Sequence, residues 1–111
     1  MLEDQETLKR VADQDRSELV RRSAVAKITD PAFVKRFVHD MDWRMRMEIV
    51  RNRSFDDQET LAWLAENDGH HGVRHFAVDR LDAEHLRRLA ESSERPSIRE
   101  YAASKLRLAA A

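Results

Sequence analysis

An internal repeat is the feature that most constrains what this chain can fold into. The tetrapeptide QETL occurs at residues 5–8 and again at residues 58–61, an offset of 53. A further offset of 25 carries the same apolar pattern from residues 61–81 to residues 86–106. A weaker copy lies in the remaining gap, at Val34, Phe37, Val38, Asp42, Met45 and Ile49. The sequence therefore predicts four structural repeats, each of about 25 to 28 residues.

Each repeat has the pattern of two short helices. The first half reads L-x-x-L-A-x-x-D, with apolar residues at Leu8, Val11 and Ala12. The second half reads V-R-x-x-A-x-x-x-L, with apolar residues at Val20, Ala24 and Ile28. Both spacings place the apolar side chains on one face of an α-helix. One such pair cannot bury its apolar face alone, so successive pairs must stack.

We therefore predict an all-α fold, namely a right-handed α-solenoid of about four short helix pairs with about eight helices. The chain has only two glycines and two prolines, which disfavours strands joined by tight turns. We expect a single domain over residues 1–111, with repeats at approximately 4–30, 31–56, 57–82 and 83–108. The alternative is an ordinary helical bundle whose helices share a pattern by chance, and the identical tetrapeptide in register disfavours it.

Capping signals mark the expected helix ends. Residues 15–18 and 56–59 each have capping-box spacing, with Asp15 and Asp56 as the expected caps. Asp30 precedes a proline, a pairing typical of a helix start. Gly69 lies where a helix end often requires a left-handed backbone.

A family resemblance rests on these repeats. The V-R-x-x-A…L second helix, led by an acidic residue, resembles the short HEAT-like repeats. The stretch VRNRSFDDQETLAWLAEND is also similar to leucine-rich-repeat-variant solenoids. The resemblance covers about residues 5 to 106. It implies protein recognition as the usual function, while a few members are DNA-base glycosylases, phycobilin lyases or iron-dependent hydroxylases.

Several chemistries do not fit the sequence. The chain contains no cysteine, which excludes disulfides and the iron–sulfur cluster that variant repeats can carry. The His-Glu dipeptides of the hydroxylases are not matched, because His75 precedes Phe76 and Glu84 precedes His85. No nucleotide-binding loop or catalytic triad order is recognisable either. We expect neither an enzyme nor a bound cofactor.

Net charge and apolar run length bear on partners and location. The formal net charge is −1, which gives no global attraction to nucleic acid or anionic lipid. The beginning MLEDQETLKR is not expected to be a secretory signal, and apolar runs are far shorter than the roughly 20 residues of a membrane span. We expect a cytoplasmic protein with no membrane partner.

A ladder of arginines follows the first core residue of each second helix: Arg21, Arg46, Arg74 and Arg99. We expect a structural role, in which each side chain bridges to an acidic group of the preceding turn. The expected acidic groups are Asp15, Asp42, Asp68 and Glu94. The alternative is a row of cations that binds an anionic ligand.

The second repeat departs from the consensus and supplies the candidate binding residues. Trp43, Met47 and Val50 form an additional apolar stripe among arginines. Arg53 falls where Leu or Ile is expected, unless Phe55 takes that place with two extra residues in the helix. Tryptophan, methionine and arginine are enriched at protein interfaces. The candidate partner-binding residues are Trp43, Arg44, Met47, Arg51 and Trp63. The plainer interpretation is a central helix that touches neighbours on both sides.

The third repeat is acidic and rich in histidine. Residues 57–85 hold two basic and seven acidic side chains, whereas residues 31–56 hold six basic and four acidic ones. A solvated face is the usual meaning of such a charge run, and electrostatic complementarity to a partner is the alternative. His71 and His75 share a helix face at the i, i+4 spacing, which makes them weak candidates for metal ligands, and surface histidines are the alternative.

These features favour a scaffold or adaptor that binds another protein through one helical layer. Nucleic acid is the alternative partner, because Trp43 could stack on bases while the surrounding arginines contact phosphates. A second copy of the chain is a further candidate partner, since solenoid ends expose apolar surface.

Overall fold

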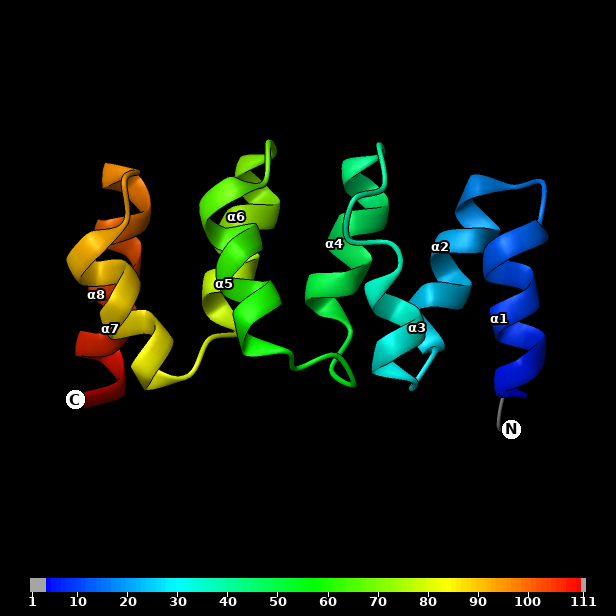
Figure 1. The fold of residues 1–111 in the computed structure, drawn as a ribbon, viewed down its shortest axis with the longest axis horizontal. Helices are drawn as coiled ribbons and strands as arrows, with labels where there is room; N and C mark the ends of the chain where they lie inside the picture. The colour runs from blue at the N-terminus through cyan, green and yellow to red at the C-terminus, as the bar shows by residue number, and fades with distance from the viewer. Residues whose placement is uncertain (1–3, 111) are drawn as a thin grey trace. The chain divides into compact units, whose positions relative to one another are not determined.

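The computed structural model describes residues 4–110 of the chain, which form eight helices and no strand. The helices are α1 (Gln5–Gln14), α2 (Glu18–Lys27), α3 (Pro31–Lys35), α4 (Trp43–Arg51), α5 (Gln58–Asn67), α6 (His71–Asp79), α7 (Ala83–Ser92) and α8 (Pro96–Ala110) (Figure 1). The all-α prediction and the number of helices are thus confirmed. Residues 1–3 and 111 of the predicted domain lie outside the described residues.

Two compact units divide the chain between Asp56 and Asp57, where the second and third repeats were expected to meet. In the first unit, α1 packs on α2 and α2 packs on α4. In the second unit, α5 packs on α6, α7 packs on α8, and α6 also contacts α8. None of the helices in residues 4–110 is long and apolar enough to cross a membrane.

Aspartate starts every first helix of a pair. The N-caps of α1, α3, α5 and α7 are Asp4, Asp30, Asp57 and Asp82, and each carboxylate accepts a hydrogen bond from a backbone N–H of the first turn. The cap expected at Asp30 is confirmed. The two predicted capping boxes are each displaced, because the caps are Ser17 and Asp57 rather than Asp15 and Asp56.

The turn inside each pair repeats one hydrogen-bond arrangement, which explains the displaced cap. Asp15, Asp40 and Asp68 each accept the backbone N–H two residues later through the side chain. A side chain used in this way holds the turn and is not available to cap the next helix. Gly69 has no positive φ, so the left-handed end predicted there is wrong. The chain leaves α5 through an extended backbone at Asp68 instead.

The arginine ladder has the predicted structural role, with a different acceptor. Each arginine donates from Nη1 to the backbone carbonyl six residues earlier, at distances of 2.5 to 2.8 Å. The acceptors are the carbonyl oxygens of Asp15, Asp40, Asp68 and Ser93. A helix C-terminus leaves carbonyl groups without intrahelical partners, and the guanidinium satisfies one of them. The four arginines, which the alternative interpretation assigned to an anionic ligand, are therefore engaged in hydrogen bonds that hold the fold together.

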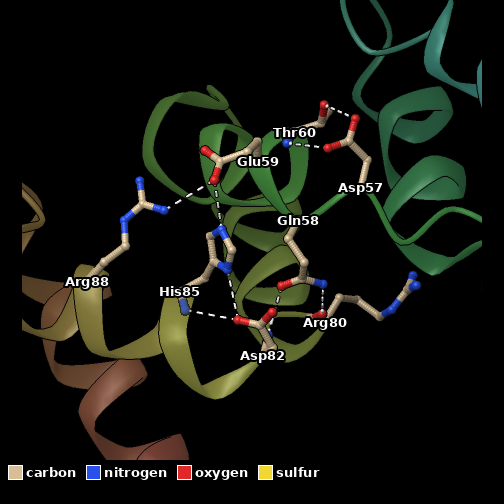
Figure 2. Close-up of polar contacts among 8 residues, drawn as sticks. All are labelled: Asp57, Gln58, Glu59, Thr60, Arg80, Asp82, His85 and Arg88. Carbon is tan, nitrogen blue, oxygen red and sulfur yellow. Dashed lines mark hydrogen bonds and ion pairs between the residues drawn. The ribbon is translucent and has the colours of Figure 1, made fainter.

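The repeated glutamine of QETL closes the connection between successive pairs. Gln5 donates to the Lys27 carbonyl at 3.2 Å and accepts from the Thr29 N–H at 2.9 Å. Gln58 makes the corresponding bonds to the Arg80 carbonyl at 3.0 Å and the Asp82 N–H at 2.8 Å (Figure 2). Both partners shift by the same 53 residues as the tetrapeptide. The identity of the two tetrapeptides thus has a structural cause.

Core positions follow the repeat in most places. Leu8, Ala24, Ile49, Leu61, Val73, Ala77, Ile98 and Ala102 are all buried. Val20 is instead 42% exposed, because the described residues contain no earlier second helix to cover α2 at this position. Phe55 replaces Arg53 in the core, as one interpretation anticipated, but α4 ends at Arg51 and the extra residues form a turn. Buried Asn52 begins this turn and donates to the carbonyls of Val25 and Ile28.

Candidate functional site

A groove of about 310 Å³ lies between α5 and α7 of the second unit. It is open because α6 and α8 pack more closely on the opposite side of the unit than α5 and α7 pack here. Helical spacing aligns its α5 wall, since Glu59, Trp63 and Glu66 occupy i, i+4 and i+7 on one face. The α7 wall is made by His85, Arg88 and Leu89.

The polar end of the groove is an ion cluster centred on His85. Its Nε2 lies 2.9 Å from a carboxylate oxygen of Glu59, and its Nδ1 lies 2.8 Å from one of Asp82 (Figure 2). Arg88 donates to the same oxygen of Glu59 at 3.2 Å. His85 is 8% exposed, whereas the side chains of Glu59, Asp82 and Arg88 lie largely in solvent around it. Two facing carboxylates require a proton on each ring nitrogen, which is the imidazolium form.

These contacts set the protonation of the cluster. The hydrogen bond that His85 donates to Glu59, followed by the one it donates to Asp82, raises the pKa of His85 above its usual value against the opposing effect of burial. The His85 hydrogen bond in turn lowers the pKa of Glu59, with Arg88 as the next cause. The backbone N–H of His85 is the largest cause of the lowered pKa of Asp82. The cluster therefore links α5 to α7 through ion pairs.

The middle of the groove combines an apolar wall with a separate carboxylate. Trp63 is 46% exposed and lines the groove together with Ala62 of α5 and Leu89 of α7. Glu66 follows one turn later, and its backbone carbonyl accepts a hydrogen bond from Arg95 Nε at 2.7 Å. This bond fixes the end of α5 against the turn that follows α7. The groove thus presents an indole face and an acidic group from a helix that is held at both ends.

The corresponding space in the first unit is filled by the chain itself. Arg36, at the end of α3, pairs with Asp13 of α1, with Nη2 and Oδ1 3.2 Å apart. Its guanidinium also lies over the Phe33 ring, 4.4 Å from the ring centre. In the second unit, His85 occupies the register of Phe33 when the N-caps Asp30 and Asp82 are aligned. The replacement of a phenyl ring by an ion-paired imidazole accompanies the open groove.

The predicted binding residues separate into two groups. Trp63 lies on the groove, whereas Trp43, Arg44, Met47 and Arg51 all belong to α4 of the first unit. Trp43 is 40% exposed, and Met47 is half-buried. Val50 is fully buried, so the apolar stripe predicted from Trp43 to Val50 does not lie on the surface as a whole. Arg44 donates to the Asp42 carboxylate at 3.1 Å, which neutralises one of the expected cations.

The histidines of α6 interact with different neighbours. His71 stacks on His70, with ring centres 4.9 Å apart. His75 Nδ1 lies 2.8 Å from the His71 carbonyl oxygen, and its ring lies against that of Tyr101, with centres 4.9 Å apart. Among residues 4–110, no cluster of three or more His, Cys, Asp or Glu side chains has metal-binding geometry.

Comparisons with protein-family models, with curated proteins and with solved structures find no match to this chain. The groove is therefore interpreted from its own residues.

Sequence reasoning missed His85, Glu59 and Arg88. Glu84 and His85 drew attention only as a reversed dipeptide, although the relevant partner of His85 is its own N-cap, Asp82. A usable signal was the spacing D-x-x-H, which occupies the place of D-x-x-T in α1 and α5. A histidine that replaces a capping-turn threonine next to a second carboxylate indicates an ion cluster.

Proposed function

We propose that this chain is a helical-repeat module that binds another protein through the groove between α5 and α7. The observation that carries the proposal is the half-exposed Trp63 on the wall of a groove whose two helices are linked by ion pairs around the buried His85. Tryptophan is among the residues that most often dominate binding energy at protein interfaces. A rigid groove also loses little conformational entropy when a partner docks.

The proposed architecture is a right-handed α-solenoid of HEAT-like repeats. The recurrence of the glutamine bonds at an offset of 53 residues supports equivalent joints between pairs. The arginine–carbonyl bonds support an equivalent turn in all four pairs. The proposal assigns the chain no catalytic role and no cofactor, and its proposed setting is the cytoplasm.

Site-specific photo-cross-linking tests this function. We would place p-benzoylphenylalanine at Ala62, which lines the groove, and compare it with the same residue at the exposed Ser97 of α8. Irradiation in lysate, with and without nuclease, should give a protein adduct at position 62 that survives nuclease. Equal adducts at both positions, or none at position 62, would contradict the proposal.

Nucleic acid is the second candidate, and the end of α4 is the observation that favours it. Arg51 and Arg53 are both exposed in the part of the chain that also exposes Trp43. Single-stranded binders combine such cations with aromatic stacking, and their affinity falls steeply with salt. A cross-link that disappears with nuclease, together with salt-dependent binding of labelled oligothymidylate that is weakened by Trp43→Ala, would favour this candidate.

A further inference from the structure

Two ion pairs join the first helices α1 and α3 inside the first unit. Lys9 Nζ of α1 lies 2.9 Å from a carboxylate oxygen of Asp30, the N-cap of α3. A carboxylate oxygen of Asp13 lies 3.2 Å from Nη2 of Arg36, at the end of α3. The preceding helix of this joint therefore supplies a basic residue and, one turn later, an acidic one. The following helix supplies an acidic N-cap and a basic residue near its end.

The charges of the preceding half recur on α7, the first helix of the last pair. When the N-caps of α1 and α7 are aligned, Lys9 matches Arg87 and Asp13 matches Glu91, so both charges keep their sign. Arg87 and Glu91 are exposed, and within residues 4–110 neither forms an ion pair or a side-chain hydrogen bond. In α5, by contrast, Ala62 takes the place of the lysine, so this half of the joint is incomplete there.

The charges of the following half recur on α1. Alignment of the N-caps Asp4 and Asp30 places Arg10 in the position of Arg36. Asp30 forms its ion pair while it caps α3, so the capping role of Asp4 is compatible with the same pairing. Arg10 is exposed, and the only hydrogen bond of its guanidinium within residues 4–110 goes to the Thr7 hydroxyl at 3.5 Å. The chain therefore carries the two complementary halves of one joint on its first and last helix pairs.

The surface of α1 is also hollowed where another first helix would pack. A concavity of about 230 Å³ is lined by five residues: Thr7, Arg10, Val11, Gln14 and Asp15. The four that belong to α1 match, in the same N-cap alignment, residues that form the α7 wall of the groove: His85, Arg88, Leu89 and Ser92. The exposed face of α1 is thus equivalent to one wall of a groove between two first helices, and no described helix supplies the other wall.

Apolar residues of the second helices show the same two incomplete ends. Val20 of α2 is exposed, whereas its counterparts in the other repeats are all buried: Met45, Val73 and Ile98. Ala103 of α8 is partly exposed, whereas its counterparts Val25 and Val78 are fully buried. Positions that are buried elsewhere in the repeat are therefore open to solvent on the first and last pairs.

We infer that the chain associates head to tail with a second copy of itself, with α7 and α8 of one copy packed on α1 and α2 of the next. Arg87 of the first copy pairs with Asp4 of the second copy, and Glu91 pairs with Arg10. These surfaces lie outside the α5 wall of the groove, so the inference goes beyond the proposed function and does not depend on it. Because the two surfaces differ, repeated contacts of this kind generate an open filament or a closed ring.

Sedimentation velocity of the whole chain, from micromolar to millimolar concentration, tests the inference. The weight-average mass should rise with concentration beyond that of a dimer, and added salt should reduce the rise because the ion pairs are exposed. Arg10→Glu and Glu91→Arg each place like charges across the joint and should each weaken association about fivefold. An equimolar mixture of the two variants should restore association, because each substituted residue then meets an opposite charge on the other variant.

Matched variants control for the change in net charge. Arg53→Glu and Asp56→Arg make the same charge changes at exposed positions outside α1 and α7, and they should leave association unchanged. Circular dichroism would verify that all four variants are folded.

A chain that stays monomeric at every concentration would overturn the inference. Equal effects of Arg10→Glu and Arg53→Glu, or a mixture of the two joint variants that does not recover, would do the same. A dimer that is weakened by Arg10→Glu but not by Glu91→Arg would assign the contact to two α1 faces and reject the head-to-tail arrangement. The cross-link at Ala62 is a separate readout, so any of these results leaves the protein-binding proposal to its own test.

Discussion

Replacing Gln58 by alanine tests the claim that the repeated tetrapeptide exists to close the joint between helix pairs. The amide of Gln58 makes two bonds to the backbone that links α6 to α7. Alanine removes both bonds and preserves helix propensity at the start of α5. The bond to the Arg80 carbonyl is partly buried, whereas the bond from the Asp82 N–H is exposed.

The expected loss follows from these environments. An intramolecular hydrogen bond contributes about 1 kcal/mol net, and more when its partner is left buried without a replacement. Water can replace the amide at Asp82 but reaches the Arg80 carbonyl less well. We therefore expect Gln58→Ala to lower the free energy of unfolding by about 1.5 kcal/mol. Gln5→Ala should cost about half as much, because both of its bonds are exposed.

Urea denaturation can assign each loss to its own unit. Each unit contains one tryptophan, so Trp63 fluorescence in a Trp43→Phe background reports the second unit and the reverse background reports the first. Gln58→Ala should lower the Trp63 midpoint, and Gln5→Ala should lower the Trp43 midpoint. The control is Gln14→Ala at the exposed end of α1, expected to change stability by less than about 0.5 kcal/mol. If Gln58→Ala behaves like Gln14→Ala, the joint does not explain the tetrapeptide.

Three further predictions concern the second unit. The pKa of His85 is raised in the folded protein, so protonated His85 stabilises the fold fully below the ordinary pKa of about 6.5, and this stabilisation is lost as pH rises through the raised pKa. The urea midpoint reported by Trp63 should therefore fall between about pH 6 and pH 9. His85→Gln should make that fall smaller. Hydrogen bonding to Asp79 raises the pKa of Tyr101, the only tyrosine of the chain, to about 12; absorbance titration should show this value, and Asp79→Asn should move it toward about 10. Arg74→Met should lower the free energy of unfolding by about 1.5 to 3 kcal/mol, through loss of a charge-assisted bond, whereas Arg87→Met on the exposed face of α7 should not.

The sequence was sufficient to predict features that depend on spacing. The repeat register, the eight helices and the structural arginines follow from apolar periodicity and from the fixed distance between a turn and the next helix. The arginine acceptor was predicted as a carboxylate because acidic side chains are visible in the sequence, whereas a carbonyl is present at every residue. Asp40 and Ser93 accept through the backbone, and this contact leaves no compositional trace.

The candidate site depended on contacts between residues far apart in the chain. His85 meets Glu59 across 26 residues, and although Glu59 belongs to the repeated tetrapeptide, His85 has no counterpart at the matching position of the other repeats. The groove is open because no side chain fills it. Arg36 pairs with Asp13 in the first unit, whereas Arg88 at the corresponding position pairs with Glu59, and the sequence does not show this difference. Trp63 could be predicted because tryptophan is enriched at protein interfaces, which is a property of the residue type and does not depend on distant contacts.

The arginine–carbonyl bond has a consequence for redesign of this chain. Because the guanidinium contacts a peptide oxygen, the contact does not specify the side chain at that position, and the four turns already differ there between aspartate and serine. The arginine contact alone is therefore sequence-tolerant, whereas the side chain at that position still holds the turn by accepting the backbone N–H two residues later. Libraries could keep this aspartate or serine and diversify the other turn residues to present new recognition loops, while the arginines keep the helices in place.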